Sequence, residues 1–101
     1  MRMLMSVTLP IEPFNTACKN GTVGKTMERI LADTKPEAVY FTERCGQRGA
    51  LVVVDLPSMS DIPRLAEPWF LQFNAEVHFG IAMTPQDLAK GGLDALGTKW
   101  A

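Results

Sequence analysis

The chain has 101 residues, of which 47% are apolar and 21% are charged, and its formal net charge is −1. This length and composition predict one globular domain spanning residues 1–101 and exclude a disordered chain. Acidic and basic side chains are interspersed, which excludes a basic patch for nucleic acid or a membrane surface, and no apolar run approaches the roughly 20 residues of a membrane span.

The N-terminal third predicts a strand and two helical pieces. Side chains from Arg2 to Leu9 alternate loosely between two sides, and Pro10 ends the strand because proline cannot donate to a sheet ladder. Apolar side chains then recur at helical spacing after Pro13 and again over residues 23–34. Glycines between the two stretches weaken the helix, and Pro36 ends the second piece.

Residues 20–26 read NGTVGKT and look like the end of a phosphate-binding loop. That loop has the form G-x-x-x-x-G-K-[ST] and follows a strand. Here Lys19 stands where the first glycine is required, and the preceding pattern is helical. We therefore interpret residues 24–26 as a helix start with a solvated lysine.

Two strands are predicted next, joined as a hairpin. Residues 37–45 alternate, with Val39 and Phe41 on one side and Tyr40 and Thr42 on the other. Residues 46–49, GQRG, read as a compact polar loop with a glycine at each end. Residues 50–56, ALVVVDL, are apolar on both sides over the first five, although an antiparallel sheet commonly has one wet face.

Two short helices, a fourth strand and a terminal helix complete the chain. Ser58 caps a helix expected over residues 59–66, and Pro68 is expected to end it, so that a separate helix follows over residues 68–74. Residues 75–83 alternate as a strand, with His78, Gly80 and Ala82 on one side. Residues 84–91 have the cap, proline and glycine of a short helix, whereas residues 93–101 show no clear pattern.

This order of elements is that of an α+β, ferredoxin-like split βαββαβ fold, with a four-stranded antiparallel sheet, two main helices on one face and a short C-terminal helix. The helices can cover only one face. The apolar third strand, with Gly80 and Ala82 of the fourth, would leave an apolar patch on the other. A second copy would cover that patch by burying roughly 800 Å² per partner, which predicts a homodimer through the sheet face.

The chain also resembles known proteins. Its element order and two-faced sheet resemble the dimeric α+β barrel superfamily, which includes muconolactone isomerases, small cofactorless monooxygenases and YCII-related proteins. More closely, four phrases resemble an uncharacterised bacterial family of similar length: EPFN at 12–15, KPEAVYF at 35–41, EPWF at 67–70 and MTPQDL at 83–88. The resemblance implies a dimeric barrel with a cavity beside the sheet, and it carries over no catalytic residue.

An export signal is not predicted. Arg2 interrupts the apolar stretch at residues 1–7, and no small-residue cleavage site follows it. We therefore expect a cytoplasmic protein in which the sequon at residues 20–22 is unmodified. Cys18 and Cys45 are expected to be reduced, with a disulfide between them as the alternative.

The barrel-facing side of the sheet carries the candidate ligand residues. His78 is the only histidine, the residue type that changes charge near neutral pH, so it is the candidate catalytic group for proton transfer. Ser6, Tyr40 and Thr42 would line the pocket beside it, and Trp69 its mouth. The alternatives are a hydrogen-bonded wall histidine and packing roles for both aromatics. Near the hairpin, two arginines could bind a carboxylate or remain solvated: Arg44 and Arg48.

We expect a small homodimeric protein that binds a small, mostly apolar molecule, aromatic or lactone-like, with isomerase- or monooxygenase-like proton chemistry. A non-catalytic binding or sensing protein and a protein-interaction module are the alternatives. One histidine and two widely spaced cysteines do not make a zinc site, and no cofactor motif is present. Neither a metal nor a cofactor is therefore expected, and neither nucleic acid nor a membrane is an expected partner.

Overall fold

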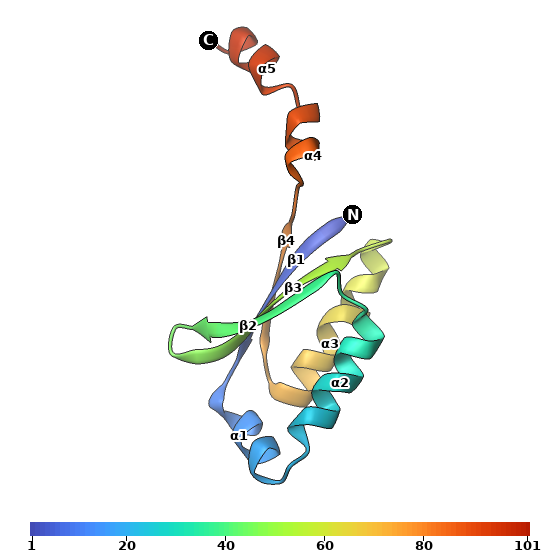
Figure 1. Cartoon of the computed structure of the whole chain (residues 1–101), viewed down its shortest axis with the longest axis vertical. Coiled ribbons are helices and arrows are strands. Elements are labelled where there is room, and N and C mark those ends of the chain that lie inside the picture. Colours follow the sequence, from blue (N-terminus) through green and yellow to red (C-terminus); the bar gives the residue numbers. More distant parts are fainter.

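The computed structural model describes residues 1–101 and has the predicted α+β, ferredoxin-like architecture (Figure 1). Its elements in chain order are β1 (Arg2–Leu9), α1 (Ile11–Lys19), α2 (Val23–Thr34), β2 (Ala38–Arg44), β3 (Gln47–Asp55), a 3-10 turn η1 (Met59–Asp61), α3 (Ile62–Phe73), β4 (Glu76–Ile81), α4 (Pro85–Lys90) and α5 (Leu93–Lys99).

The four strands form one antiparallel sheet in the order β2-β3-β1-β4. Helices α2 and α3 lie side by side against one face of this sheet, and α1 lies beyond one end of it (Figure 1). The predicted β1 has the observed bounds. The break between α1 and α2 is also as predicted, with Gly21 in a left-handed conformation at φ 76°.

The hydrophobic core lies between the sheet and the two long helices. Met5 and Val7 of β1 are completely buried, as are Leu65 and Trp69 of α3. Phe14 of α1 joins this core by stacking on Phe73 with a ring separation of 5.2 Å. The centre of one face of the sheet is therefore packed against the helices, and this burial stabilises a chain of this size.

Two local predictions are wrong. Pro68 does not end a helix, because α3 continues through it from Ile62 to Phe73. The proline removes one backbone hydrogen bond, but Leu65 and Trp69 on either side of it are both buried, and this packing outweighs the local preference.

The hairpin is tighter than the predicted four-residue loop. Strands β2 and β3 pair up to Arg44 and Gln47, so that only Cys45 and Gly46 form the turn. Both have positive φ, 51° and 80°, which is the conformation of a two-residue turn suited to strand twist. The polar residues Gln47 and Arg48 therefore belong to the strand.

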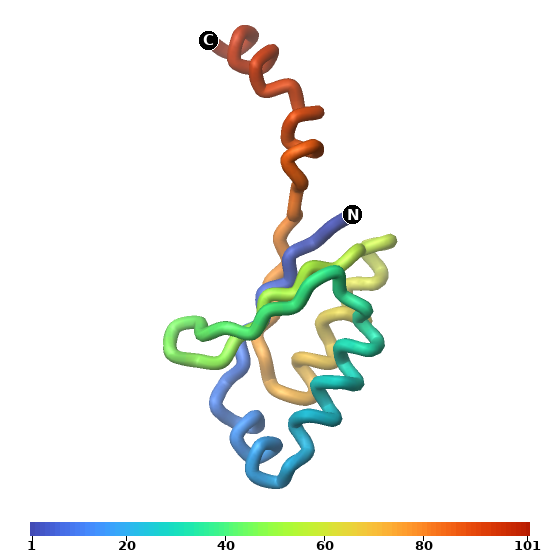
Figure 2. The backbone as a smooth tube through the Cα atoms, viewed as in Figure 1, coloured from blue at the N-terminus to red at the C-terminus, as the bar shows by residue number.

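Residues 82–101, which we name the C-terminal arm, extend away from the layered part of the chain (Figure 2). The molecule consequently measures 60 × 29 × 19 Å. Helix α4 has the predicted cap: Thr84 Oγ1 accepts from the backbone N–H of Asp87, and Asp87 Oδ2 accepts from the backbone N–H of Thr84. Helix α5 was not predicted, since its seven residues gave no clear pattern.

Candidate functional site

One face of the sheet has no helix over it (Figure 1). We name this surface the open face. Because strand side chains alternate, its members are the residues that alternate with the core-facing ones. They are Arg2, Leu4, Ser6 and Thr8 of β1, Ala38, Tyr40, Thr42 and Arg44 of β2, Gly49, Leu51, Val53 and Asp55 of β3, and Glu76, His78 and Gly80 of β4.

A single row of the open face contains three of the predicted site residues. The strand register places Tyr40 opposite Leu51, Leu51 opposite Ser6, and Ser6 opposite His78. Directly opposed side chains on an antiparallel sheet lie about 5 Å apart, so this row runs across all four strands. A phenol, an aliphatic side chain, a hydroxyl and an imidazole thus follow one another in a line, which we name the Tyr40–His78 row.

The two neighbouring rows of the open face have different characters: one is mostly polar and the other is apolar. Thr42, the fourth residue predicted on this face, lies in the row with Gly49, Thr8 and Glu76. On the other side, the row consists of Ala38, Val53, Leu4 and Gly80. The Tyr40–His78 row is therefore bordered by an apolar strip on one side and hydroxyl and carboxylate groups on the other. This is the mixture of surfaces that small-molecule sites use.

His78 has one acidic neighbour. Its Nε2 lies 4.0 Å from Oε2 of Glu76, two residues earlier on the same strand and therefore on the same face. Both side chains are about three quarters exposed in the single chain, so the attraction between them is screened by water. A carboxylate in this position would stabilise a protonated imidazole more strongly if water were excluded.

Trp69 does not belong to this group. Its side chain is completely buried in the core, on the helix-covered side of the sheet. The prediction that it lines a pocket mouth is wrong, because α3 runs unbroken through Pro68 and directs Trp69 and Phe73 toward the sheet. The indole Nε1 of Trp69 is buried without a hydrogen-bond partner.

The two arginines near the hairpin lie on opposite faces. Arg48 is engaged with α1, because its Nη2 donates to Asn15 Oδ1 at 2.8 Å and its guanidinium lies 4.5 Å from the ring centroid of Phe14. Arg44 is on the open face, and its side-chain stem crosses Gly49 so closely that a Cβ there would meet it at 2.8 Å. Only Arg44 therefore remains available to an anionic group at the open face.

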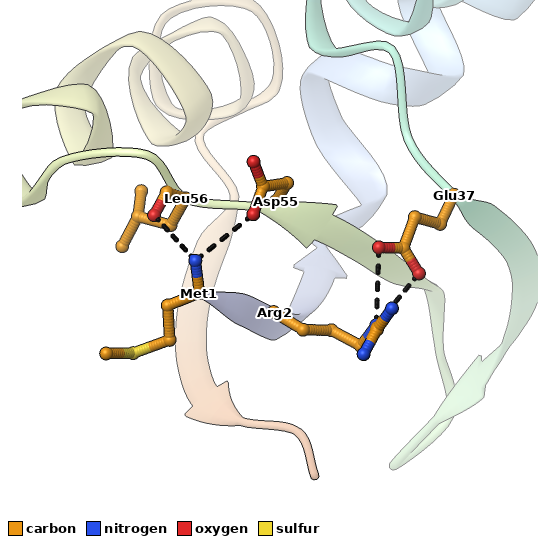
Figure 3. Close-up of polar contacts among 5 residues, drawn as sticks. All are labelled: Met1, Arg2, Glu37, Asp55 and Leu56. Carbon is orange, nitrogen blue, oxygen red and sulfur yellow. Dashed lines mark hydrogen bonds and ion pairs between the residues drawn. The ribbon is translucent and has the colours of Figure 1, made fainter. Parts of the chain in front are cut away.

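Polar contacts fasten the end of the sheet from which the arm leaves (Figure 3). The N-terminal amine donates to Asp55 Oδ1 and to the carbonyl oxygen of Leu56, each at 3.1 Å. Arg2 donates from Nε to both carboxylate oxygens of Glu37, at 3.2 and 2.9 Å. These hydrogen bonds, with the attraction of the carboxylate, raise the pKa of Arg2 above its ordinary value.

A separate concavity of about 530 Å³ lies on the opposite side of the molecule, between α2 and α3. Its wall includes four charged side chains, Arg29, Asp33, Arg64 and Glu67. None of the predicted site residues lines it. The open face and this groove are therefore two independent candidate surfaces, and only the open face collects the predicted residues.

The cysteines, the possible metal ligands and the lengths of the helices were also considered in the sequence analysis. Cys18 and Cys45 are free and exposed, so the alternative of a disulfide between them is wrong. No group of three or more histidine, cysteine or acidic side chains is arranged to hold a metal ion. No helix has the length and apolar character needed to cross a membrane.

Sequence reasoning left two residues of the face, Leu51 and Glu76, out of the predicted site. Leu51 was treated only as part of an apolar strand, yet it is the centre of the Tyr40–His78 row. Glu76 was not considered, although its spacing of two from His78 puts both on one face of a strand. Arg44 was predicted as a possible carboxylate ligand beside the hairpin, and the structure places it on the open face with Tyr40 and Thr42.

No protein-family model and no curated protein sequence matches the chain. Among solved structures, it is similar to 5-chloro-2-hydroxyhydroquinone dehydrochlorinase from Burkholderia phenoliruptrix AC1100, in complex with 2,5-dihydroxybenzoquinone. That match has a TM-score of 0.58 and 12% identity, and it covers 85% of this chain and 97% of that chain. At this identity the likeness shows the fold alone.

Two further structures are more distant. The de novo designed protein Ferredog-Diesel has a TM-score of 0.46 and 10% identity, covering 80% of this chain and 85% of its own. A formyltetrahydrofolate deformylase from Pseudomonas putida KT2440 has a TM-score of 0.45 and 12% identity, covering 80% of this chain and 28% of its own. The resemblance of four sequence phrases to one bacterial family stays a prediction.

Proposed function

We propose that this protein binds a small, planar, mostly apolar molecule, aromatic or lactone-like, against the open face of its sheet. The observation that carries the proposal is the Tyr40–His78 row, in which Tyr40, Ser6 and His78 offer hydrogen-bonding groups around an aliphatic floor at Leu51. A planar ring needs such a floor, and its polar substituents need a few fixed partners.

A second copy of the chain would complete the site. Tyr40 is 68% exposed and Leu4 is 37% exposed in the single chain, and Leu51 and Val53 beside them are half-buried. Apolar side chains gathered in this way mark an interaction surface. Two open faces packed together would form a barrel with the ligand space between them, and each face would lose its contact with water.

His78 is the proposed proton acceptor. Its Nε2 would take a proton from a hydroxyl group or from a carbon next to a carbonyl of the bound molecule, and would return that proton to another atom of the molecule. The carboxylate of Glu76, 4.0 Å away, would stabilise the imidazolium formed in between. Such a transfer is isomerase-like and needs no cofactor. The same first step would prepare a substrate for reaction with dioxygen in a monooxygenase.

The fold neighbour supports the ligand class. The dehydrochlorinase with the same fold was solved with 2,5-dihydroxybenzoquinone, which is small, planar and oxygen-substituted. That protein's chemistry is not transferred, because the two chains share only 12% identity. Its ligand is nevertheless a suitable probe for an open face with one aliphatic floor and several hydroxyl and imidazole groups.

The decisive experiment is an NMR titration of the full chain with 2,5-dihydroxybenzoquinone. We expect amide shifts to change for residues 6, 40, 51 and 78 and to stay constant around the α2–α3 groove. Replacing the phenol in Tyr40→Phe should weaken binding about three- to tenfold, the usual effect of one hydrogen bond. Phe41→Leu is the matched control, because Phe41 is its neighbour on the other face. Changes confined to the groove, or none, would contradict the proposal.

A second measurement separates catalysis from binding. Native mass spectrometry of the protein purified without added ligand reports the copy number and any retained molecule together. If that molecule is turned over, His78→Asn should lower the rate by about 100-fold or more while leaving the molecule bound. Activity that survives this substitution removes the catalytic assignment. Binding without turnover identifies a binding or sensing protein.

A further inference from the structure

The C-terminal arm carries apolar side chains that nothing in its own chain covers. Every residue from Pro85 to Ala101 is exposed, and Trp100 is 77% exposed. In α5, Leu93 and Leu96 are three residues apart and share one side of the helix, and Trp100 follows as its C-terminal cap residue. Leu88 and Leu93 also line one shared concavity between α4 and α5. The arm is therefore amphipathic along its length.

Helices as short as these need a surface to pack on. Helix α4 has six residues and α5 has seven. Isolated helices below about 12 residues are marginal in water, because nucleation is costly and tertiary packing supplies most of their stability. The capping box at Thr84 stabilises the start of α4, but neither helix has a buried residue. The missing surface must come from elsewhere.

The geometry of the linker directs the arm away from its own sheet. The arm follows β4 without a turn, and the backbone N–H of Ala82 still bonds to the carbonyl oxygen of Arg2, at 3.2 Å. Thr84 is extended, with φ −76° and ψ 164°, as expected for a residue before proline. No glycine lies between Ile81 and Pro85 to allow a reversal. The arm thus projects beyond the end of its own open face (Figures 1 and 2).

The area of the open face indicates what the arm meets. Four strands spaced about 4.8 Å apart, paired over about six residues of roughly 3.4 Å each, give a face of about 400 Å². A stable dimer usually buries about 800 Å² per partner. The flat area of the open face is about half of this figure. The arm, which continues directly from β4, carries further exposed apolar side chains that could add to the interface, among them Leu88, Leu93 and Trp100.

We propose that the arms are exchanged between two copies of this chain, so that α4 and α5 of each copy pack their apolar side on the other copy. The inference rests on the proposed homodimer through the open face. Each arm leaves its sheet at the end where Arg2 pairs with Glu37, so it would reach the second copy at the margin of the space between the two open faces. The proposed ligand site is then incomplete without the arm of the partner copy.

Isotope-filtered NMR on the full chain tests the exchange. Labelled and unlabelled chains are mixed in equal amounts, unfolded and refolded together, and the total mass is confirmed by light scattering. We expect cross-peaks between the Leu96 methyl groups or the Trp100 indole of one chain and protons of the other. Cross-peaks confined to one chain, arm shifts of a random coil, or a single-chain mass would each overturn the proposal.

These outcomes also separate this inference from the proposed function. A dimer with unstructured arms that still binds 2,5-dihydroxybenzoquinone at residues 6, 40 and 78 overturns arm exchange and leaves the binding role standing. Inter-chain arm contacts without any ligand response at those residues support arm exchange and reject the binding role. A single-chain mass overturns the exchange and the two-copy form of the site together.

A matched pair of variants provides a second readout. Leu96→Asp places a charge on the apolar side of α5, and Ala95→Asp places the same charge on the opposite side of the same helix. We expect the dissociation constant of the dimer to rise about tenfold or more for Leu96→Asp and to stay within about twofold for Ala95→Asp. Both side chains are exposed in the single chain, so the fold should persist, which amide shifts of the core strands would verify. Equal dissociation constants for the two variants would overturn the proposal.

Discussion

The two faces of one sheet differ in how completely the chain uses them. On the helix-covered face, Met5, Val7 and Val52 are completely buried and pack against α2 and α3. On the open face, Leu4 and Leu51 lie one residue away from Met5 and Val52 on the same strands, and no helix covers them. Apolar side chains dominate the covered face, whereas the open face mixes apolar side chains with charged and hydroxyl-bearing ones. The two faces therefore differ in composition as well as in coverage.

This difference indicates where the chain folds and where it functions. At the centre of the covered face the helices remove the apolar side chains from water, whereas Phe41 and Ile81 toward its edges stay exposed. The open face combines uncovered apolar groups with the three polar groups of the Tyr40–His78 row, and it adjoins an arm with an uncovered apolar side of its own. Ligands and partners are expected on a surface whose apolar side chains the fold leaves uncovered.

The largest expected effect lies on the covered face. Trp69→Ala would remove the largest completely buried side chain and leave a cavity, which should lower the free energy of unfolding by about 3–5 kcal/mol. Chemical denaturation followed by circular dichroism measures this. Phe70→Ala is the control on the same helix, because Phe70 is 39% exposed and should cost well under 3 kcal/mol. Similar costs for the two variants would mean that the core has been misassigned.

The second effect belongs to the open face. Leu51→Asp should cost little in a single chain, because the carboxylate can reach water. In a sheet-to-sheet dimer, however, the same carboxylate would be buried without a partner. We expect the dissociation constant to rise by about 100-fold or more, measured by sedimentation equilibrium. Leu71→Asp on the outer side of α3 is the matched control and should leave it unchanged. A Leu51→Asp protein that dimerises normally would remove the open face from the interface.

Much of the covered face could be predicted from the sequence. Alternation in β1 placed Met3, Met5, Val7 and Leu9 on one side, and all four are buried. The register on the open face also followed from alternation, so Ser6 and His78 were predicted on one side and lie opposite each other. A period of two fixes the face of a side chain regardless of the loops, which is why these predictions succeeded.

The failures have different causes, and in only one of them did tertiary packing override a local signal. Pro68 has poor helix propensity, but burial of Leu65 and Trp69 around it keeps α3 continuous, and that continuity placed Trp69 in the core instead of at a pocket. Helix α5 gave no signal because seven residues are too few for periodicity to stand out. The projection of the arm depends on three linker residues, and a sequence pattern does not give their direction.

Two glycines of the open face, Gly49 and Gly80, differ in how much space surrounds them. A Cβ at Gly49 would meet the Arg44 stem at 2.8 Å and the backbone oxygen of Val7 at 3.1 Å, whereas at Gly80 the nearest atom is 4.0 Å away. Gly49→Ala should therefore lower the free energy of unfolding by about 1–2 kcal/mol, and Gly80→Ala should raise it by about 0.5 kcal/mol. Thermal unfolding of the pair measures this. A larger cost for Gly80→Ala would show that something closely covers that end of the open face.

The smallest effect is a pH dependence of the arm. Backbone and side-chain hydrogen bonds with Thr84, aided by Arg2, hold the pKa of Asp87 below its ordinary value of 3.8. A carboxyl group with a lowered pKa stabilises the folded form above its ordinary pKa, and that stabilisation is lost as the pH falls through the lowered one. We expect α4 to be intact at neutral pH and to lose helical amide shifts over residues 85–90 below about pH 4, before the core strands change.

Asp87→Asn is the control for this transition, because its amide oxygen can still accept the hydrogen bond of Thr84 but does not titrate in this range. The variant should keep its α4 shifts unchanged through the acid range in which the natural chain loses them. An acid transition of the same midpoint in both proteins would mean that α4 is released by dissociation of the two copies instead of by loss of its own cap. That outcome would mean that α4 depends on the partner copy more than on its own capping box, because the helix would persist only while a second open face is present.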